Sequence, residues 1–179
     1  MAEFALPTGR LVLRNWRQAD VAPFHAMCQD PQVMAYLGPP ITLERAQEIV
    51  DHQRLFQAEH GHCFWAMERL SDGAMLGFCG LKPGPADTPL EGRVEIGWRL
   101  RADVWGQGYA REAAKACLDW GFANLPDDRI WAITVPANTR SWGLMERLGM
   151  ARHEDLGFDH PALPADSPLL RHITYSIGR

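Results

Sequence analysis

The chain has 179 residues, 46% hydrophobic and 22% charged, which fits one folded domain over residues 1–179. Eighteen Lys and Arg residues against 22 Asp and Glu residues give a net charge of −4 with no basic run, which argues against a nucleic-acid partner. No stretch approaches the ~18 apolar residues of a membrane span, and residues 1–9 do not resemble a secretory signal. We therefore expect a cytoplasmic location, no membrane partner, and a monomer or homodimer.

The cysteines and histidines give no indication of a metal site. The four cysteines have no CxxC spacing, so neither a zinc cluster nor a disulfide framework is predicted, and a reducing compartment is the default. His60 and His62 flank Gly61 without a supporting cluster of cysteines or carboxylates, and we interpret them as loop histidines. The prediction is a protein without a bound metal.

The first half of the chain combines one strand, several helices and a hairpin. Apolar residues predict a strand at 10–16, while Asp20, the Asp30-Pro31 pair and Thr42 are typical helix starts. The run Ser71-Asp72-Gly73 between two β-prone segments predicts a hairpin. The expected elements are the strand 10–16, helices at 21–28, from 31 and at 42–59, and strands at 63–70 and 74–81.

The second half alternates between strands and helices. A period of two over Arg93–Leu100 predicts a strand, and apolar residues at helical spacing predict a helix over 109–124. Strands at 130–135, 150–158 and 171–177 and a helix at 139–148 complete the chain. This order predicts an α/β (α+β) fold with a mixed sheet.

A glycine-rich turn, Trp105-Gly106-Gln107-Gly108-Tyr109-Ala110, joins a predicted strand to a predicted helix. Backbone N–H groups at such a helix start can bind a phosphate, and glycine permits close approach. The turn lacks the Gly-Lys-Ser/Thr of a Walker loop, and Arg111 occupies the third glycine position of a dinucleotide fingerprint. A nucleotide-dependent oxidoreductase is therefore disfavoured. This motif alone does not distinguish a phosphate-binding turn from a turn that binds no ligand.

Three motifs together resemble the GNAT superfamily of N-acetyltransferases, most closely its RimJ/RimL-like branch. They are V-E-I-G-W-R-L, W-G-Q-G-Y-A-R-E-A and N-T-R-S-W-G-L-M-E-R-L-G-M, and the segments 8–20 and 30–37 look like the N-terminal half of that branch. The resemblance implies a mixed, mostly antiparallel sheet of about six to seven strands, flanked by helices and splayed at the central strands. It also implies acetyl-CoA as the acetyl donor and an amine as the acceptor.

The resemblance assigns the cofactor contacts to three segments. Backbone groups of residues 98–100 would bind the pantetheine arm, the loop 106–111 would hold the pyrophosphate, and Asn138 would contact the pantetheine or simply cap a helix. Charge would come from Arg111 and Arg101. The predicted cofactor-binding residues are Trp98, Arg99, Leu100, Trp105, Gly106, Gln107, Gly108, Tyr109, Ala110, Arg111, Asn138 and Arg140.

Two residues are candidates for proton transfer. Glu95 is the expected base, acting directly or through water, and the alternative is an ion pair with Arg93 or Arg99. Met145 stands where many GNAT enzymes carry a catalytic tyrosine, so Ser141 or water would protonate the CoA thiolate. Because methionine stands in place of that tyrosine, the alternative interpretation is a non-catalytic acyl-CoA-binding module.

Candidate acceptor contacts come from two further segments. By the resemblance, Tyr36 and the run that holds Phe158 and His160 border the acceptor site. No cysteine adjoins the motifs as a nucleophile would, so we expect direct attack of the amine in a ternary complex. The leading hypothesis is an N-acetyltransferase acting on a protein N-terminus or a small primary amine.

Overall fold

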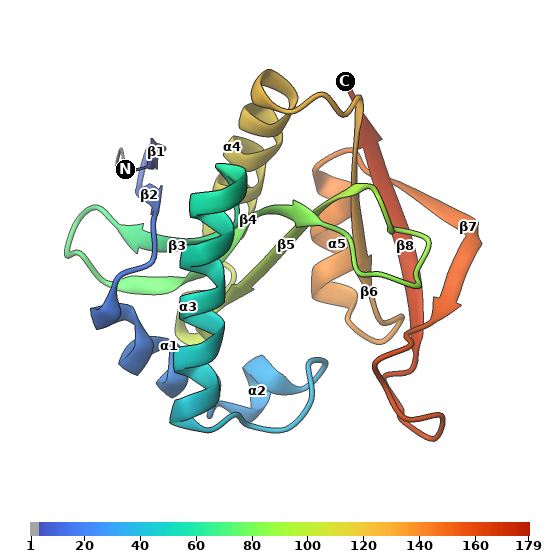
Figure 1. The fold of residues 1–179 in the computed structure, drawn as a ribbon, viewed down its shortest axis with the longest axis horizontal. Helices are drawn as coiled ribbons and strands as arrows, with labels where there is room; N and C mark the ends of the chain where they lie inside the picture. The colour runs from blue at the N-terminus through green and yellow to red at the C-terminus, as the bar shows by residue number, and fades with distance from the viewer. Residues whose placement is uncertain (1–3) are drawn as a thin grey trace.

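A computed structural model describes residues 4–179, which form an α/β fold around a mixed sheet of eight strands (Figure 1). The strand order is β1-β2-β3-β4-β5-β6-β8-β7. The strands are β1 (Ala5–Pro7), β2 (Leu11–Arg14), β3 (Phe64–Arg69), β4 (Met75–Pro83), β5 (Val94–Leu100), β6 (Arg129–Thr134), β7 (Ala151–Asp159) and β8 (Arg171–Gly178). The α-helices are α1 (Val21–Met27), α2 (Pro31–Met34), α3 (Leu43–His60), α4 (Tyr109–Asn124) and α5 (Thr139–Arg147).

The two central strands of the sheet separate along their length. β5 and β6 form its parallel pair, and they pair only at Val94 with Ile130 and at Glu95 with Trp131. The remainder of β5 pairs with β4 alone, as far as Leu100. The predicted splay is therefore confirmed, and it leaves the β6-facing edge of residues 96–100 without a strand partner.

The two faces of β5 meet different helices, because side chains alternate along a strand. Ile96 is paired with Leu81, and Gly121 of α4 packs against Leu81 and Ile130, so this face lies under α4. Figure 1 shows α3 crossing in front of β3 and β4, with α4 behind the sheet. Glu95, Gly97 and Arg99 belong to the alternate set of β5 side chains, which lies on the face opposite α4.

A glycine allows an aromatic ring to lie across this second face. A Cβ on Gly97 would come within 2.6 Å of the Phe64 ring, so any larger residue would displace that ring. Phe64 also stacks on Phe78 of β4, with ring centroids 5.4 Å apart. Two aromatic rings therefore cover the middle of the face between Glu95 and Arg99.

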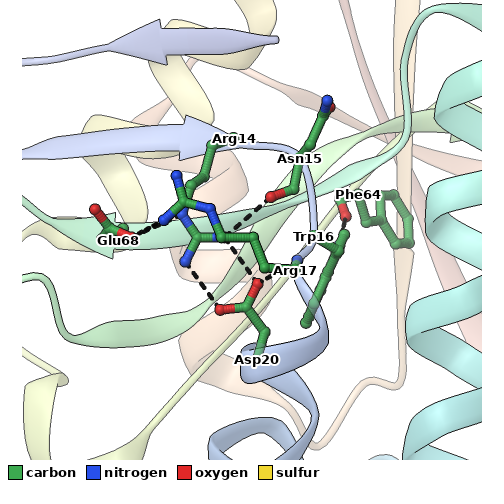
Figure 2. A network of polar contacts seen from close by, with 7 residues as sticks. All are labelled: Arg14, Asn15, Trp16, Arg17, Asp20, Phe64 and Glu68. Atoms are coloured by element: carbon green, nitrogen blue, oxygen red, sulfur yellow. Dashed lines mark hydrogen bonds and ion pairs between the residues drawn. The ribbon is translucent and has the colours of Figure 1, made fainter. Parts of the chain in front are cut away.

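A buried ionic network fixes the N-terminal wall of the fold (Figure 2). The Arg14 guanidinium donates to both carboxylate oxygens of Asp20, at 2.7 and 2.9 Å, and to Glu68 at 2.7 Å. The Arg14 and Asp20 side chains are each 5% exposed. Nearby, the Trp16 indole donates to the Phe64 carbonyl at 2.6 Å. These bonds tie the end of β2 to the start of α1 and to β3.

Most of the predicted elements are confirmed. The helix 109–124 has the predicted bounds, the others agree within a few residues, and Asp30 and Thr42 cap their helices as expected. The fold class is confirmed, and the eighth strand is the short β1, whose three residues carry no periodic signal. The expectation that Asp20 caps α1 is wrong, because its carboxylate binds Arg14 and the Arg17 amide instead. No helix of residues 4–179 could span a membrane.

Candidate functional site

The gap between β5 and β6 contains a cavity of about 190 Å³, here called the splay cavity. It combines residues from both separated strands with the first turns of α5. The lining residues are Leu37, Phe64, Phe78, Glu95, Ile96, Gly97, Trp98, Arg99, Ile133, Thr134, Asn138, Ser141 and Met145. The cavity brings the two candidate catalytic residues, Glu95 and Ser141, into one space.

A second cavity of about 230 Å³, the loop cavity, lies between the end of β5, α2 and α5. It shares Leu37, Trp98, Arg99, Asn138 and Ser141 with the splay cavity, so the two cavities adjoin, and together they are here called the channel. Its other lining residues are Gln32, Val33, Tyr36, Leu100, Trp105, Gly106, Arg140, Leu144 and Arg147. Seven predicted cofactor residues therefore line one cavity: Trp98, Arg99, Leu100, Trp105, Gly106, Asn138 and Arg140.

A third cavity of about 550 Å³, the α3 cavity, lies between α3 and the sheet. It shares Phe64, Phe78 and Arg99 with the splay cavity. The other lining residues are Trp16, Phe24, Arg45, Glu48, Ile49, His52, Gln53 and Lys82. The splay cavity thus adjoins both other cavities, and Arg99 lines all three.

Glu95 has the electrostatic properties of a base poised near neutral pH. Burial disfavours its ionised form and raises the pKa of the carboxyl to about 7, while the charge of Lys82 lowers it by a smaller amount. Lys82 lies directly opposite Glu95 on β4. Among residues 4–179 no cation lies within ion-pair distance of Glu95, so the ion pair with Arg93 or Arg99 does not form. Arg93 instead stacks on Trp131, 4.1 Å from the ring centroid.

The start of α5 places two polar side chains at the splay cavity. The Asn138 Oδ1 accepts a hydrogen bond from the Ser141 amide at 3.3 Å, so the predicted cap is present. Both residues line the cavity, which leaves the Asn138 amino group and the Ser141 hydroxyl for other contacts. Met145, one turn further on, is 2% exposed and presents an apolar thioether to the same space.

The glycine loop has the conformation of an anion-binding turn. Gly106 and Gly108 have φ values of +74° and +84°, which favour glycine, and a Cβ on Gly106 would meet no atom within 4 Å. No side chain caps the first turn of α4, so its N–H groups are not used by a capping residue. The loop therefore offers backbone donors and close access, as a bound phosphate requires.

A bridge from β2 holds this loop in place. Arg10 donates to the Gln107 carbonyl at 2.9 Å and forms an ion pair of 2.7 Å with Glu112 of α4. Its guanidinium also lies 4.3 Å from the centroid of the Tyr109 ring. Tyr109 is buried, so its side chain packs and only its backbone faces the turn. Sequence reasoning missed the Arg10–Glu112 bridge because it joins residues about a hundred positions apart.

The arginines near the glycine loop differ in whether they already have a partner within the protein. Arg140 lies over the Trp105 ring at 4.6 Å, and the Trp105 indole donates to the Leu100 carbonyl at 3.0 Å. Arg101 forms an ion pair of 2.6 Å with Asp103, which satisfies its charge locally. Arg111 is exposed on the first turn of α4. Gln107, Gly108, Tyr109, Ala110 and Arg111 flank the loop cavity without lining it.

The predicted acceptor contacts do not all lie at the cavities. Tyr36 lines the loop cavity and is 39% exposed. Phe158 and His160 are absent from the three linings and form a ring cluster with His172, whose centroid is 5.0 Å from that of His160. Burial and the charge of Lys82 lower the pKa of His160, which places this cluster in the field of Lys82.

Sequence reasoning also missed the walls of the α3 cavity. The strand positions with side chains on one face hold Phe64, Phe78 and Lys82. The period of two in the predicted hairpin indicates that such residues share a face. That period identifies a shared face but not which helix covers it.

Comparison with known proteins identifies the family. The family model described as "Acetyltransferase (GNAT) domain" matches residues 10–151, most of the chain. The chain belongs to the GNAT acetyltransferase family. It is therefore an acyltransferase, and the uncharacterized protein YkkB of Bacillus subtilis (strain 168) is 33% identical to it over 150 residues. That alignment covers 83% of this chain and 86% of YkkB.

Solved structures of acetyltransferases have the same fold. An acetyltransferase from Agrobacterium tumefaciens str. C58 matches with a TM-score of 0.77 and 27% identity, covering 100% of this chain and 96% of that chain. RimL, a ribosomal L7/L12 α-N-protein acetyltransferase, matches with a TM-score of 0.78 at 14% identity, covering 100% and 96%. The RimL likeness is one of fold alone.

Proposed function

We propose that this acyltransferase transfers the acetyl group of acetyl-CoA to a primary amine by direct attack, with Glu95 as the base. The observation that carries the proposal is the position of Glu95. Its carboxyl, with a pKa near 7, lines a cavity that shares residues with both the loop cavity and the α3 cavity. Donor and acceptor would then reach the same base from these two cavities.

The donor would enter through the loop cavity. The pyrophosphate of acetyl-CoA would bind the backbone N–H groups at Gly106–Arg111, which suits an acidic protein because the anion site needs few cationic side chains. The unpaired edge of β5 at residues 98–100 would hydrogen-bond the pantetheine arm. Asn138 and Arg140 would contact the same arm from α5.

The transfer requires a neutral amine, because an ammonium group has no lone pair. Glu95 would take the ammonium proton, directly or through water, and the freed nitrogen would then attack the thioester carbonyl carbon. The C–N bond forms, the C–S bond breaks, and a proton passes from nitrogen to solvent or base. The leaving sulfur takes up a proton to become the CoA thiol.

Ser141 would supply the proton to the leaving sulfur. Its hydroxyl lines the splay cavity, where Met145 offers no acidic proton. Water is the competing source of this proton. A hydroxyl held at the start of α5 would leave the donor geometry fixed while the thiolate departs.

The acceptor would be a protein N-terminus or a small primary amine, as in the RimJ/RimL-like branch. The resemblance of the N-terminal segments 8–20 and 30–37 to that branch supports this proposal. An α-amino group has a pKa of about 7.7–8.0, against about 10.4 for lysine, so it loses its proton far more readily near neutral pH. A carboxylate base with a pKa near 7 suits such an amine.

The test measures acetyl-CoA binding by calorimetry and CoA thiol release with a panel of amines. Gly106→Asp places a negative charge at the proposed pyrophosphate site, and Gly106→Asn is its neutral counterpart; both residues tolerate positive φ. Gly92→Asp is the control, because Gly92 also has a positive φ and open space but lies in a distant loop. We expect about tenfold weaker acetyl-CoA binding only in Gly106→Asp. No binding of acetyl-CoA by the unaltered protein would contradict the proposal.

A further inference from the structure

Arg99 is an arginine without an anionic partner in a mostly enclosed setting. Its Nε is buried and has no hydrogen-bond partner, and its Nη1 donates to the Cys28 thiol at 3.2 Å, a weak acceptor. Within residues 4–179 no carboxylate lies within ion-pair distance of its guanidinium. Arg99 is partly exposed, but a buried N–H donor without an acceptor is costly, so its Nε is unusual for a purely structural residue.

Aromatic rings surround the guanidinium and orient it. Its carbon lies 5.5 Å from the Phe78 ring centroid and 5.9 Å from that of Phe24. These rings lie on β4 and α1, and they also line the α3 cavity. The rings stabilise the cation by their faces but give no hydrogen-bond acceptor to the Nε and Nη2 groups, since only Nη1 has a partner, the Cys28 thiol. The remaining donors are therefore free to bind an acceptor group in the cavity.

The α3 cavity has a positive balance of side-chain charge. Lys82 and Arg99 have no carboxylate partner within residues 4–179, whereas Arg45 and Glu48 neutralise each other through an ion pair of 2.8 Å. The two unpaired cations lie at opposite ends of the same sheet face, because Lys82 is paired with Glu95 and Phe78 with Arg99. Phe64 and Phe78 lie between these ends.

We propose that the α3 cavity binds the acceptor, and that the acceptor is a primary amine carrying a carboxylate that Arg99 holds. Glu95 and Arg99 are four residues apart on one strand, a Cα separation of ~13 Å at about 3.3 Å per residue. The amine and the carboxylate are therefore separated by several bonds, with an apolar or aromatic body between them. The cavity volume of about 550 Å³ is in the range of small-molecule sites.

This inference rests on the proposed function, because it uses Glu95 as the group that receives the amine. A guanidinium binds a carboxylate through two parallel N–H donors, which fixes orientation as well as affinity. Such an acceptor could be a free metabolite-sized amine or the N-terminus of a peptide with an acidic side chain. Both sources share the same chemistry, and the test includes one matched pair for each.

The first experiment measures kcat/KM for two matched pairs of amines with saturating acetyl-CoA. The small pair is 4-(aminomethyl)benzoate and 4-(aminomethyl)benzamide, which differ only in the charged group. The peptide pair is Ser-Asp-Gly-amide and Ser-Asn-Gly-amide. We expect a preference of about 10- to 100-fold for the carboxylate in at least one pair, and the preferred pair identifies the source. Equal use of both members of both pairs would overturn the inference.

The second experiment uses variants of Arg99. In Arg99→Gln the carboxylate preference falls to about onefold. The preference is the ratio of kcat/KM for the two members of a pair in the same variant, so a change in acetyl-CoA binding, which acts on both members, cancels from it. Arg99→Lys retains part of the preference, since it keeps the charge but loses the paired donors. Arg54→Gln is the control: Arg54 is exposed on α3 and lies outside the α3 cavity lining. A carboxylate preference that persists in Arg99→Gln would also overturn the inference.

Binding measurements separate this inference from the proposed function. If no amine is acetylated, the proposed function fails, and calorimetry of 4-(aminomethyl)benzoate against 4-(aminomethyl)benzamide still tests Arg99. Tighter binding of the benzoate, lost in Arg99→Gln, supports an anion site in the α3 cavity. Equal or absent binding of both compounds contradicts it, whatever the outcome with acetyl-CoA.

Discussion

Two regions of this protein bury charge in opposite ways. At the N-terminal wall, Arg14 lies between Asp20 and Glu68, and every charge in that network has a partner (Figure 2). At the splay, Glu95 and Arg99 lie on the same face of one strand without an ion pair to each other or to any other of the residues 4–179. Partnered charges hold elements together, whereas unpartnered charges at a cavity are available to a ligand.

The pKa values follow the same division. Burial lowers the pKa of the Arg14 guanidinium, but hydrogen bonds to Asp20 and Glu68 outweigh that effect and raise it overall. At Glu95, burial raises the pKa of the carboxyl to about 7, and the charge of Lys82 offsets only a part of that rise. The network around Arg14 therefore keeps its charges over the whole physiological pH range. The Glu95 carboxyl can instead gain or lose a proton within that range.

Removing the unpartnered carboxylate is the change with the largest expected effect. In Glu95→Gln, kcat/KM should fall about 10³-fold at pH 8, roughly 4 kcal/mol, because the amine loses its base. Acetyl-CoA affinity should stay within about twofold. Steady-state kinetics measures both, with Glu154→Gln on β7 as the control, since that exposed glutamate pairs only with Arg152. Normal kcat/KM in Glu95→Gln would exclude the base role.

Breaking the partnered network should cost stability instead. Asp20→Ala leaves the buried Arg14 guanidinium with one carboxylate, and the free energy of unfolding should fall by about 3 kcal/mol in urea titrations. Asp51→Ala, which removes an exposed ion pair with Arg54, should cost less than about 1 kcal/mol. The kcat/KM of folded Asp20→Ala should match that of the unaltered protein. A loss of stability no greater than that of Asp51→Ala would contradict the assigned role.

The unpartnered carboxylate should make the fold weaker at high pH. The pKa of Glu95 is raised from 4.5 to about 7, so between these values the folded state binds more protons than the unfolded state. The contribution of Glu95 to stability therefore declines as the pH rises from about 5 to 8. At pH 8 Glu95→Gln should be more stable than the unaltered protein by about 3 kcal/mol, and at pH 4.5 the difference should nearly vanish. Equal urea midpoints at both pH values would show that Glu95 is not buried as described.

The smallest effect is expected at Ser141. Ser141→Ala should lower kcat about tenfold, equivalent to about 1.4 kcal/mol, because water can enter the channel and replace the hydroxyl as proton donor. Ser71→Ala in an exposed turn provides the matched control. Turnover that is unchanged in Ser141→Ala would remove this hydroxyl from the mechanism and leave water as the donor.

Local sequence signals predicted most of the fold. The caps at Asp30, Thr42 and Asn138 and the alternation in β5 depend on neighbouring residues, so they can be identified without tertiary structure. Asp20 looked like another cap, but a buried Arg14 outcompeted the helix for its carboxylate. The three-residue β1 is stabilised by pairing with β2, a contact that no periodicity indicates.

The candidate site was predictable in its residue types but not in its pairings. Sequence reasoning proposed Glu95 and Ser141 for proton transfer, and the splay brings both to one cavity. Whether Glu95 meets Arg99 or Lys82 depends on strand register and on which helix covers the face, and neither is encoded locally. Phe158 and His160 lie in a ring cluster outside the cavities and stay predictions as acceptor contacts.

The pH dependence of kcat/KM, measured for the unaltered protein and for Glu95→Gln with the same amine, tests the central claim most directly. We expect kcat/KM of the unaltered protein to rise with a midpoint near pH 7, where the Glu95 carboxyl loses its proton, and this step to disappear in Glu95→Gln. The amine's own titration should remain in both profiles at higher pH. A step near pH 7 that persists unchanged in Glu95→Gln would contradict the account.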